Sequence, residues 1–205
     1  MQNNVINITT VQKKKWVRKM CVILEKMRNK APEQLLLEYD IPLTPPIDLK
    51  QLVKKIGITE IAFDFSKIEE VSNKPKGSIC GAIYANGDNL GIFYKSDDTM
   101  NRQRFTIAHE IAHCCLDTDS LKQRHLEYRN TTTQTDPKEI RANIFAGELL
   151  IPESIIRSIH KRIYVAPRLS DLANLFQVSI PVMTARLENL GLTYIKDEGF
   201  GNVEI

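Results

Sequence analysis

The sequence predicts an α+β fold in which helices and a small antiparallel sheet share one hydrophobic core. Three observations lead to this expectation: an apolar helix at residues 105–116, a strand pair at 79–84 and 90–94, and two short helices at 170–177 and 180–189. A chain of 205 residues is long enough to bury one core, or one core with a small appendage.

Breakers and caps define the N-terminal elements. A helix is expected over residues 11–29, and Ala31-Pro32 ends it, because the residue before a proline disfavours the helical conformation. The proline-rich segment 39–46 is expected to be an extended connector. Residues 48–56 have the pattern of a short amphipathic helix, which Gly57 ends because glycine accepts a left-handed conformation.

Three segments are expected to form the sheet. Residues 58–65 are rich in β-branched and aromatic side chains, which favour strands. The segments 79–84 and 90–94 flank Asn86-Gly87-Asp88-Asn89, a turn sequence that predicts a β-hairpin. The polar segment 117–136 is expected to be a surface loop.

The C-terminal third is expected to be helical. Asp136 is a candidate N-cap and Pro137 suits the first helical position, so a helix should begin there; another is expected at 153–162. The following pair of short helices, closed by Gly191, resembles a helix-turn-helix. Its second helix offers only Arg186 as a base, whereas helices that enter a DNA groove usually present several, so packing on the body is favoured.

Positive charge is concentrated at the N-terminus. Residues 1–30 contain eight Lys or Arg residues and one acidic residue, whereas the remainder contains 20 basic and 24 acidic residues. The stretch 13–19 could contact nucleic acid. The favoured interpretation is a basic amphipathic helix packed on the body through Trp16, Met20, Ile23, Leu24 and Met27.

Composition also bears on the cellular location. No apolar run approaches the length of a membrane span, and the N-terminus lacks the features of a signal peptide, so we expect a cytoplasmic protein without a membrane partner. The four cysteines form no CxxC pair, so reduced thiols are expected. Cys114 and Cys115 follow a histidine directly, but helical geometry points them away from it, and they are expected to act as small hydrophobic side chains.

The segment His109-Glu110-Ile111-Ala112-His113 is the main candidate site. On a helix, residues four apart share a face, so both imidazoles can reach one metal ion. The surrounding helix is apolar on most of its circumference and should be buried, where ionisable groups need partners. A bound metal ion would be such a partner for the two histidines. The alternative interpretation is that they are core histidines bonded to backbone carbonyls.

Neutral imidazoles suit zinc, and a catalytic zinc usually has three protein ligands and an open position for water. Glu139 is the favoured third ligand. It follows Asp136 by three residues, so capping of its own helix is an alternative role. Asp119 has the ligand spacing of a second zinc class, but Leu116 stands where that class has a turn-forming glycine, which disfavours it.

A zinc ion at this site would lower the pKa of a water molecule to about 7 and polarise a carbonyl group. Glu110 would then act as general base and pass the proton to the leaving amine, a reaction suited to peptide hydrolysis. His125 and Tyr128 could donate to the developing oxyanion, although surface positions without a role are the favoured interpretation. Glu148 could lie near the site, but a structural salt bridge or hydrogen bond is its favoured role.

Taken together, these segments resemble the ImmA/IrrE family of zinc metallopeptidases, which are gluzincin-like enzymes with an HExxH motif. The resemblance spans roughly residues 47–192, with Ala112 where many relatives carry glycine and no match before residue 40. The matching segments are 104–113, Glu139 with Ala142-Asn143 and Phe145-Ala146, 148–152, and a tail of 176–179, Met183, Arg186-Leu187 and Leu190-Gly191.

The resemblance implies a zincin-like core, one Zn²⁺ per chain held by His109, His113 and Glu139, and Glu110 as the general base. It also implies a protein substrate, a helix-turn-helix transcriptional repressor, whose cleavage would derepress its target genes. The alternative is a catalytically silent module that keeps the metal and sequesters a repressor or toxin; the presence of Glu110 favours the enzyme. The expected parts are a basic helical extension (1–40), a zincin-like metallopeptidase domain (41–165) and a helix-turn-helix-like region packed on the core (166–205).

Overall fold

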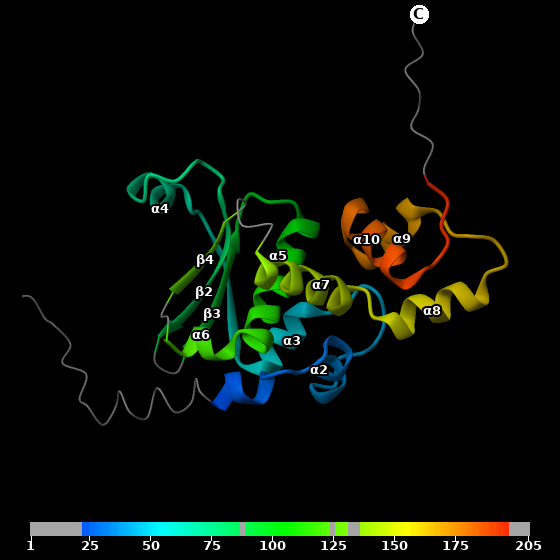
Figure 1. Ribbon diagram of the computed structural model, residues 1–205, viewed down its shortest axis with the longest axis horizontal. Helices are drawn as coiled ribbons and strands as arrows, with labels where there is room; N and C mark the ends of the chain where they lie inside the picture. Colours follow the sequence, from blue (N-terminus) through cyan, green and yellow to red (C-terminus); the bar gives the residue numbers. More distant parts are fainter. Residues whose placement is uncertain (1–21, 87–88, 124–125, 131–135, 197–205) are drawn as a thin grey trace, which may run out of the picture.

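The computed structural model describes residues 22–86, 89–123, 126–130 and 136–196. Within these residues a four-stranded sheet has the order β1-β3-β2-β4. Helices lie against one side of the sheet, and a further group of helices lies beyond them (Figure 1). The α+β prediction is therefore confirmed. The strands are β1 (Ile58–Phe63), β2 (Ile79–Asn86), β3 (Asn89–Lys95) and β4 (Leu126–Asn130).

The sheet is mixed rather than wholly antiparallel. The predicted hairpin is present, with β2 and β3 antiparallel and Ile83 opposite Ile92. The predicted first strand is also present, but β1 runs parallel to β3, with Ile58 opposite Leu90. β1 can pair with β3 rather than with β2 because a long connection separates β1 from β2. This connection includes α4 (Ser66–Val71).

The expectation of a surface loop at 117–136 is wrong for part of that segment. Its first residues form α6 (Thr118–Gln123), in which Leu121 is buried. Residues 126–130 form β4, which pairs with β2 in the antiparallel sense. The polar composition of this segment does not predict a strand. β4 forms because backbone pairing with a neighbouring strand can override a weak local preference.

The helices mostly begin and end where capping residues predict. Asp48 accepts a hydrogen bond from the Gln51 amide at the start of α3, and Gly57 ends that helix with φ of 91°. Residues 22–27 of the predicted N-terminal helix are helical, and its earlier part lies outside the described residues. The remaining helices are α2 (Pro32–Glu38), α3 (Leu49–Ile56), α5 (Met100–Leu116), α7 (Pro137–Leu150), α8 (Glu153–Arg162), α9 (Leu169–Phe176) and α10 (Ile180–Leu190).

Helix α5 lies at the centre of the core. It packs against β2 and β3 on one side and against α7 on the other. One cluster of buried side chains extends from Leu24 through this helix to Leu187 in α10. A smaller cluster, built on Phe65, Ile79 and Ala82, lies apart from it. The main core therefore joins the N-terminal helices, the sheet and the C-terminal helices.

The C-terminal helix pair packs against the body, as favoured by the sequence. Arg186 of α10 is only 7% exposed. Its guanidinium donates hydrogen bonds to the Ile151 carbonyl at 3.1 Å and to the Glu148 carboxylate at 3.1 Å. The single base of this helix is thus committed to internal contacts. No helix among the described residues is long and apolar enough to cross a membrane.

Candidate metal centre

Two histidines of α5 present their Nε2 atoms to one point. His109 is fully buried, and the side chain of His113 is 13% exposed. The two Nε2 atoms lie 2.9 Å apart. The four-residue spacing places both rings on one face of the helix. The expected pairing of the two imidazoles is therefore present in the structure.

Helix α7 brings a carboxylate to the same point. Asp136 accepts a hydrogen bond from the Lys138 amide at 2.8 Å, and this cap starts the helix so that Glu139 lies in its first turn. One oxygen of Glu139 lies 3.1 Å from Nε2 of His109, and the other lies 3.4 Å from Nε2 of His113. Glu139 therefore faces the histidines, and Asp136 supplies the cap.

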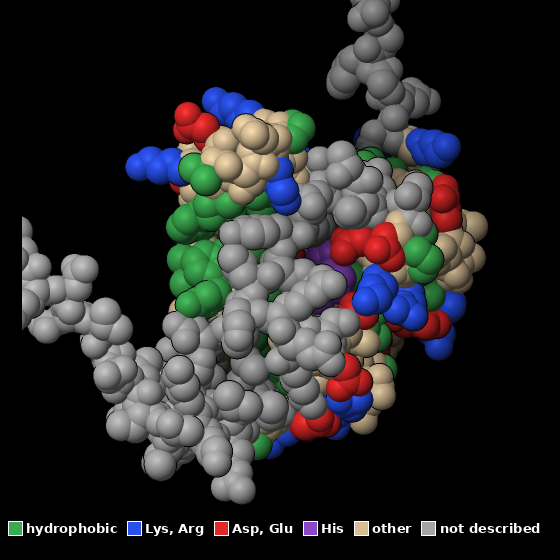
Figure 2. Space-filling view, turned by 60° about the vertical axis from the view of Figure 1, so that its left-hand side comes forward, with side chains coloured by type: hydrophobic (Ala, Val, Ile, Leu, Met, Phe, Trp, Pro, Cys, Tyr) green, Lys and Arg blue, Asp and Glu red, His purple; other side chains and the backbone are tan. Residues whose placement is uncertain are grey.

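The three side chains have the spacing that a metal ion needs. Their ligand atoms all lie within 4.8 Å of one another. Ligands of a tetrahedral zinc at 2.0–2.2 Å should be separated by about 3.3–3.6 Å, close to the distances found between Glu139 and the two rings. Histidine surface is visible beside acidic and basic side chains in Figure 2. The donor set of two imidazoles and one carboxylate thus fits a catalytic zinc site.

The competing ligand, Asp119, lies elsewhere. Its side chain is 73% exposed and forms an ion pair with Arg28. Helix α5 continues through Leu116, and α6 begins at Thr118, so the chain does not turn back towards the histidines. Of these two candidates, Glu139 is the one whose carboxylate lies beside the Nε2 atoms.

The second nitrogen of each ring also has a fixed partner. Nδ1 of His109 lies 2.9 Å from the Asn143 side-chain oxygen, and Nδ1 of His113 lies 2.8 Å from a carboxylate oxygen of Asp117. Each Nδ1–H can donate to its partner, which leaves both Nε2 lone pairs available for a metal. The sequence reasoning did not assign these roles. The sequence signal that could have revealed these partners is their spacing. Asp117 follows His113 by four residues, and Asn143 follows Glu139 by four residues.

The electrostatics of the site favour positive charge. Hydrogen bonds from His109 and His113 hold the pKa of Glu139 well below its usual range, although burial opposes this effect. Burial lowers the pKa of His113, but hydrogen bonds to Asp117 and Glu139 outweigh it and raise this pKa to about 10. A divalent cation bound to Nε2 would take the place of that proton. The carboxylates therefore suit a cation at the point where the rings meet.

Glu110 lies between α5 and the sheet, and it is 2% exposed. A Cβ added at Gly81 of β2 would lie 2.8 Å from Oε1 of Glu110 and 2.6 Å from the Thr106 methyl group. A shift in strand register between Ile79 and Gly81 accompanies this close approach. A larger residue here would force the Thr106 side chain and the Glu110 carboxylate to shift, so the close approach of β2 helps to fix the Glu110 carboxylate.

Of the remaining predicted site residues, Glu148 is the one whose side chain the structure describes. Glu148 pairs with Arg186 at 3.1 Å, which is the structural role that was favoured. Tyr128 lies in β4 opposite Ala82, and its side chain is not described. His125 lies outside the described residues.

The cysteines that follow the motif behave as buried hydrophobic side chains. Cys80, Cys114 and Cys115 are free thiols, and all three are buried. Burial raises the pKa of Cys115 to about 12 and the pKa of Cys114 well above its ordinary value. Protonated thiols are poor metal ligands, so they do not compete with the histidines.

The residues of this centre lie in a segment that matches a known protein family. The family model for the IrrE N-terminal-like domain, Peptidase_M78, matches residues 68–188. The matched segment contains both histidines, Glu110 and Glu139, together with the ring partners Asp117 and Asn143. No curated protein matched the chain.

Proposed function

Because the chain belongs to the IrrE N-terminal-like peptidase family, we propose that it is a zinc-dependent metalloendopeptidase. His109, His113 and Glu139 are the metal ligands, and Glu110 is the general base. The observation that carries the proposal is the meeting of two Nε2 atoms and one carboxylate within 4.8 Å. Zinc is the favoured metal because it accepts two neutral imidazoles and a carboxylate and keeps one position open.

When bound, zinc would supply an acidified water and polarise the peptide carbonyl. The protein groups then have separate tasks. Glu110 accepts the proton of the attacking water and delivers it to the amine of the leaving peptide. Asn143 and Asp117 hold the imidazole rings through their Nδ1–H groups. The Glu139 side chain is 17% exposed, whereas His109 is fully buried.

The substrate we propose is a helix-turn-helix transcriptional repressor, whose cleavage would derepress its target genes. The support is the resemblance to the ImmA/IrrE metallopeptidases, which cut repressors of this kind. Such a substrate would also place the reaction in the cytoplasm. Direct reading of DNA by α10 is disfavoured, because its one base, Arg186, is buried.

The test is to mix the zinc-loaded protein with a candidate helix-turn-helix repressor from the same organism and to follow the fragments by mass spectrometry. The wild type should cut the repressor at one site. Glu110→Gln should bind zinc but lose cleavage by about 100-fold or more, because the base contributes roughly that much. Equal cleavage by both proteins would refute the role of Glu110. Binding without cleavage by the wild type would favour the silent, sequestering module.

Metal content tests the third ligand separately. Glu139→Ala should lose zinc during dialysis against a chelator. Asp119→Ala is the matched control, since Asp119 is an acidic side chain that pairs with Arg28 away from the histidines. Zinc retained by Glu139→Ala at wild-type affinity would contradict the assignment.

A further inference from the structure

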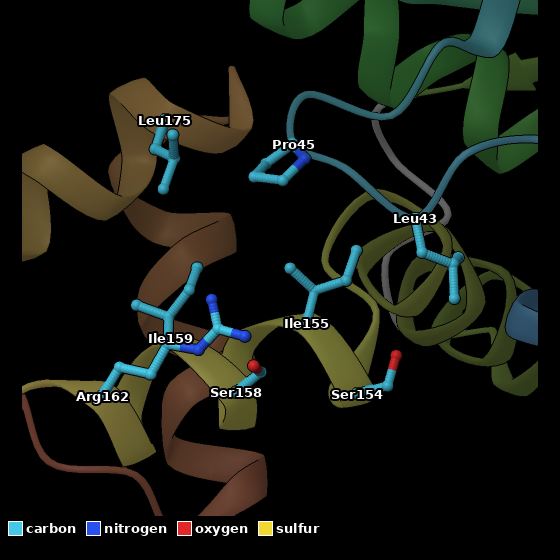
Figure 3. Close-up of a pocket in the computed structure, with 8 residues that line it drawn as sticks. All are labelled: Leu43, Pro45, Ser154, Ile155, Ser158, Ile159, Arg162 and Leu175. Atoms are coloured by element: carbon cyan, nitrogen blue, oxygen red, sulfur yellow. The ribbon is translucent and has the colours of Figure 1, made fainter.

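A groove runs along α8, outside the metal centre. Its volume is about 510 Å³, and its walls come from α8, from α9 and from the 39–46 connector (Figure 3). The residues that line it include neither the proposed metal ligands nor the two partners of their rings. The groove is therefore a surface separate from the metal centre.

One face of α8 forms the floor of this groove. Ile155, Ser158, Ile159 and Arg162 follow one another at intervals of three or four residues, so they lie along one side of the helix. Figure 3 shows Ile155, Ile159 and Arg162 projecting from α8 towards α9 and the connector. This side of α8 therefore has the pattern of a face that packs against another helix.

A different face of α8 attaches the helix to the rest of the protein. Ile156 is fully buried. The Arg157 guanidinium donates a hydrogen bond to the Leu190 carbonyl at 3.3 Å, and Nε2 of His160 lies 3.1 Å from the Thr193 carbonyl oxygen. The face of α8 that lines the groove is therefore not the one that holds the helix to α10 and the segment after it.

The groove combines apolar surface with positive charge. Ile155 and Ile159 are half-buried, and Leu175 of α9 is 44% exposed. The Arg162 side chain lines the groove in the last turn of α8, and Lys161 is exposed beside it. Within the described residues neither cation forms an ion pair. An occupant with apolar side chains and a carboxylate would match both features.

The two ends of the groove differ in charge. At the start of α8, the Glu33 carboxylate accepts a hydrogen bond from the amide of Ser154, which lines the groove. The last turn of α8 carries Lys161 and Arg162. A carboxylate of an occupant is therefore attracted to the Arg162 end and repelled from the Glu33 end. This difference gives a bound segment a preferred direction.

A protein substrate offers more to recognise than the bond that is cut. The metal centre contacts only the few residues around that bond, whereas a helix-turn-helix repressor is built of helices. Grooves with an apolar floor bind amphipathic helices through side chains spaced by three, four and seven residues. The spacing of the apolar side chains on α8 suits a partner of this kind.

We propose that the groove between α8, α9 and the 39–46 connector binds an amphipathic helix of the protein substrate. The apolar side chains of that helix contact Ile155, Ile159 and Leu175, and one of its carboxylates pairs with Arg162. The inference rests on the proposed peptidase function for the identity of the partner. The groove holds the folded repressor, and the metal centre acts on another segment of it.

The test compares cleavage of the whole repressor with cleavage of a short peptide that spans the same bond. Leu175→Asp and Arg162→Glu should each raise KM for the repressor at least about tenfold and leave kcat unchanged, because each removes a contact to the bound helix. Both variants should hydrolyse the short peptide with the kcat/KM of the wild type. The matched controls are Val71→Asp, at an exposed apolar residue of α4, and Lys50→Glu, at an exposed base of α3. Both controls should behave as the wild type on both substrates.

A wild-type KM for the repressor in both groove variants would overturn the proposal. An equal loss on the short peptide would also overturn it, since the substitutions would then act through the fold or the metal centre. A photoreactive side chain at Ser158 of the Glu110→Gln protein should crosslink to one helix of the repressor. Replacing the carboxylate of that helix by lysine should raise KM, and Arg162→Glu should restore it. A failure of this rescue would contradict the pairing with Arg162.

A readout with the metal-free chain separates this proposal from the peptidase function. The probe is an alanine-based helical peptide with a stripe of leucines and two glutamates in its first turn. It should shift the methyl NMR signals of Ile155, Ile159 and Leu175 and bind at least about threefold tighter than the same peptide with lysines in place of the glutamates. No shift, or equal binding of both peptides, would overturn the proposal.

The two proposals can fail separately. If the probe shifts these signals but no repressor is cut, the groove stands and the peptidase function fails. If a repressor is cut but the groove variants keep the wild-type KM, the groove proposal fails alone. A wild-type dimer that Leu175→Asp dissociates would assign the groove to a second copy of the chain. Tighter binding of the probe after removal of residues 197–205 would assign it to that segment, and either result would overturn the proposal.

Discussion

Replacing Gly81 by alanine should disturb both the packing of α5 and the position of the proposed base. The added Cβ would lie 2.6 Å from the Thr106 methyl carbon and 2.8 Å from Oε1 of Glu110. Comfortable carbon contacts are about 3.5–4.0 Å, so the Thr106 and Glu110 side chains must move by roughly 1 Å, or α5 and β2 must separate by that distance. Overpacking of this kind typically costs about 1–3 kcal/mol. A displacement of about 1 Å at a catalytic group can lower the rate about 100-fold.

Urea unfolding and kcat/KM on a cleavable peptide measure the two effects of Gly81→Ala separately. The double variant with Thr106→Ser removes the clashing methyl group, so it should recover part of the stability. Its kcat/KM should stay low, because the Cβ still meets Glu110. Gly147→Ala is the matched glycine control and should stabilise the fold by about 0.5–1 kcal/mol, since its Cβ meets nothing within 4 Å. Wild-type stability and kcat/KM in Gly81→Ala would refute the reasoning.

Two further predictions concern the carboxylates of Asp117 and Glu69. Asp117→Ala should weaken zinc binding about 10- to 100-fold, because His113 loses its Nδ1 partner. Asp117→Asn should weaken zinc binding less, because asparagine keeps an acceptor. Competition with a chelator measures both affinities, and affinities equal to that of the wild type would contradict this role. Burial raises the pKa of Glu69, but amide hydrogen bonds from Ile79 and Gly77 outweigh it and lower the pKa below 4.5. Since the folded pKa is the lower one, Glu69 stabilises the fold above about pH 4.5 and loses this effect as pH falls through the folded pKa. Urea unfolding of Glu69→Gln should therefore show a stability deficit at pH 7 that shrinks in acid, and a deficit independent of pH would contradict the assignment.

The candidate ligands could be found from the sequence because each carries a local signal. His109 and His113 have helical spacing inside an apolar helix, and Glu139 follows a helix start marked by Asp136 and Pro137. No local sequence signal predicts that α5 and α7 meet. The site depends on the packing of α5 against α7, which brings Glu139 to within 3.1 Å of His109.

Other parts of the site carry no distinctive local signal. Asp117 and Asn143 are common polar residues, and their roles depend on the rings that they face. Gly81 looks like an ordinary strand glycine until the close approach of α5 is known. The polar segment that forms β4 was missed because an edge strand depends on pairing with β2 rather than on its own composition.

The location of bound zinc tests the central claim most directly. Crystals of the zinc-loaded protein, measured on both sides of the zinc absorption edge, should give one strong anomalous peak per chain. The account predicts this peak about 2.0–2.2 Å from Nε2 of His109, Nε2 of His113 and a carboxylate oxygen of Glu139. A peak at any other set of side chains, or no peak in crystals grown with zinc, would contradict it.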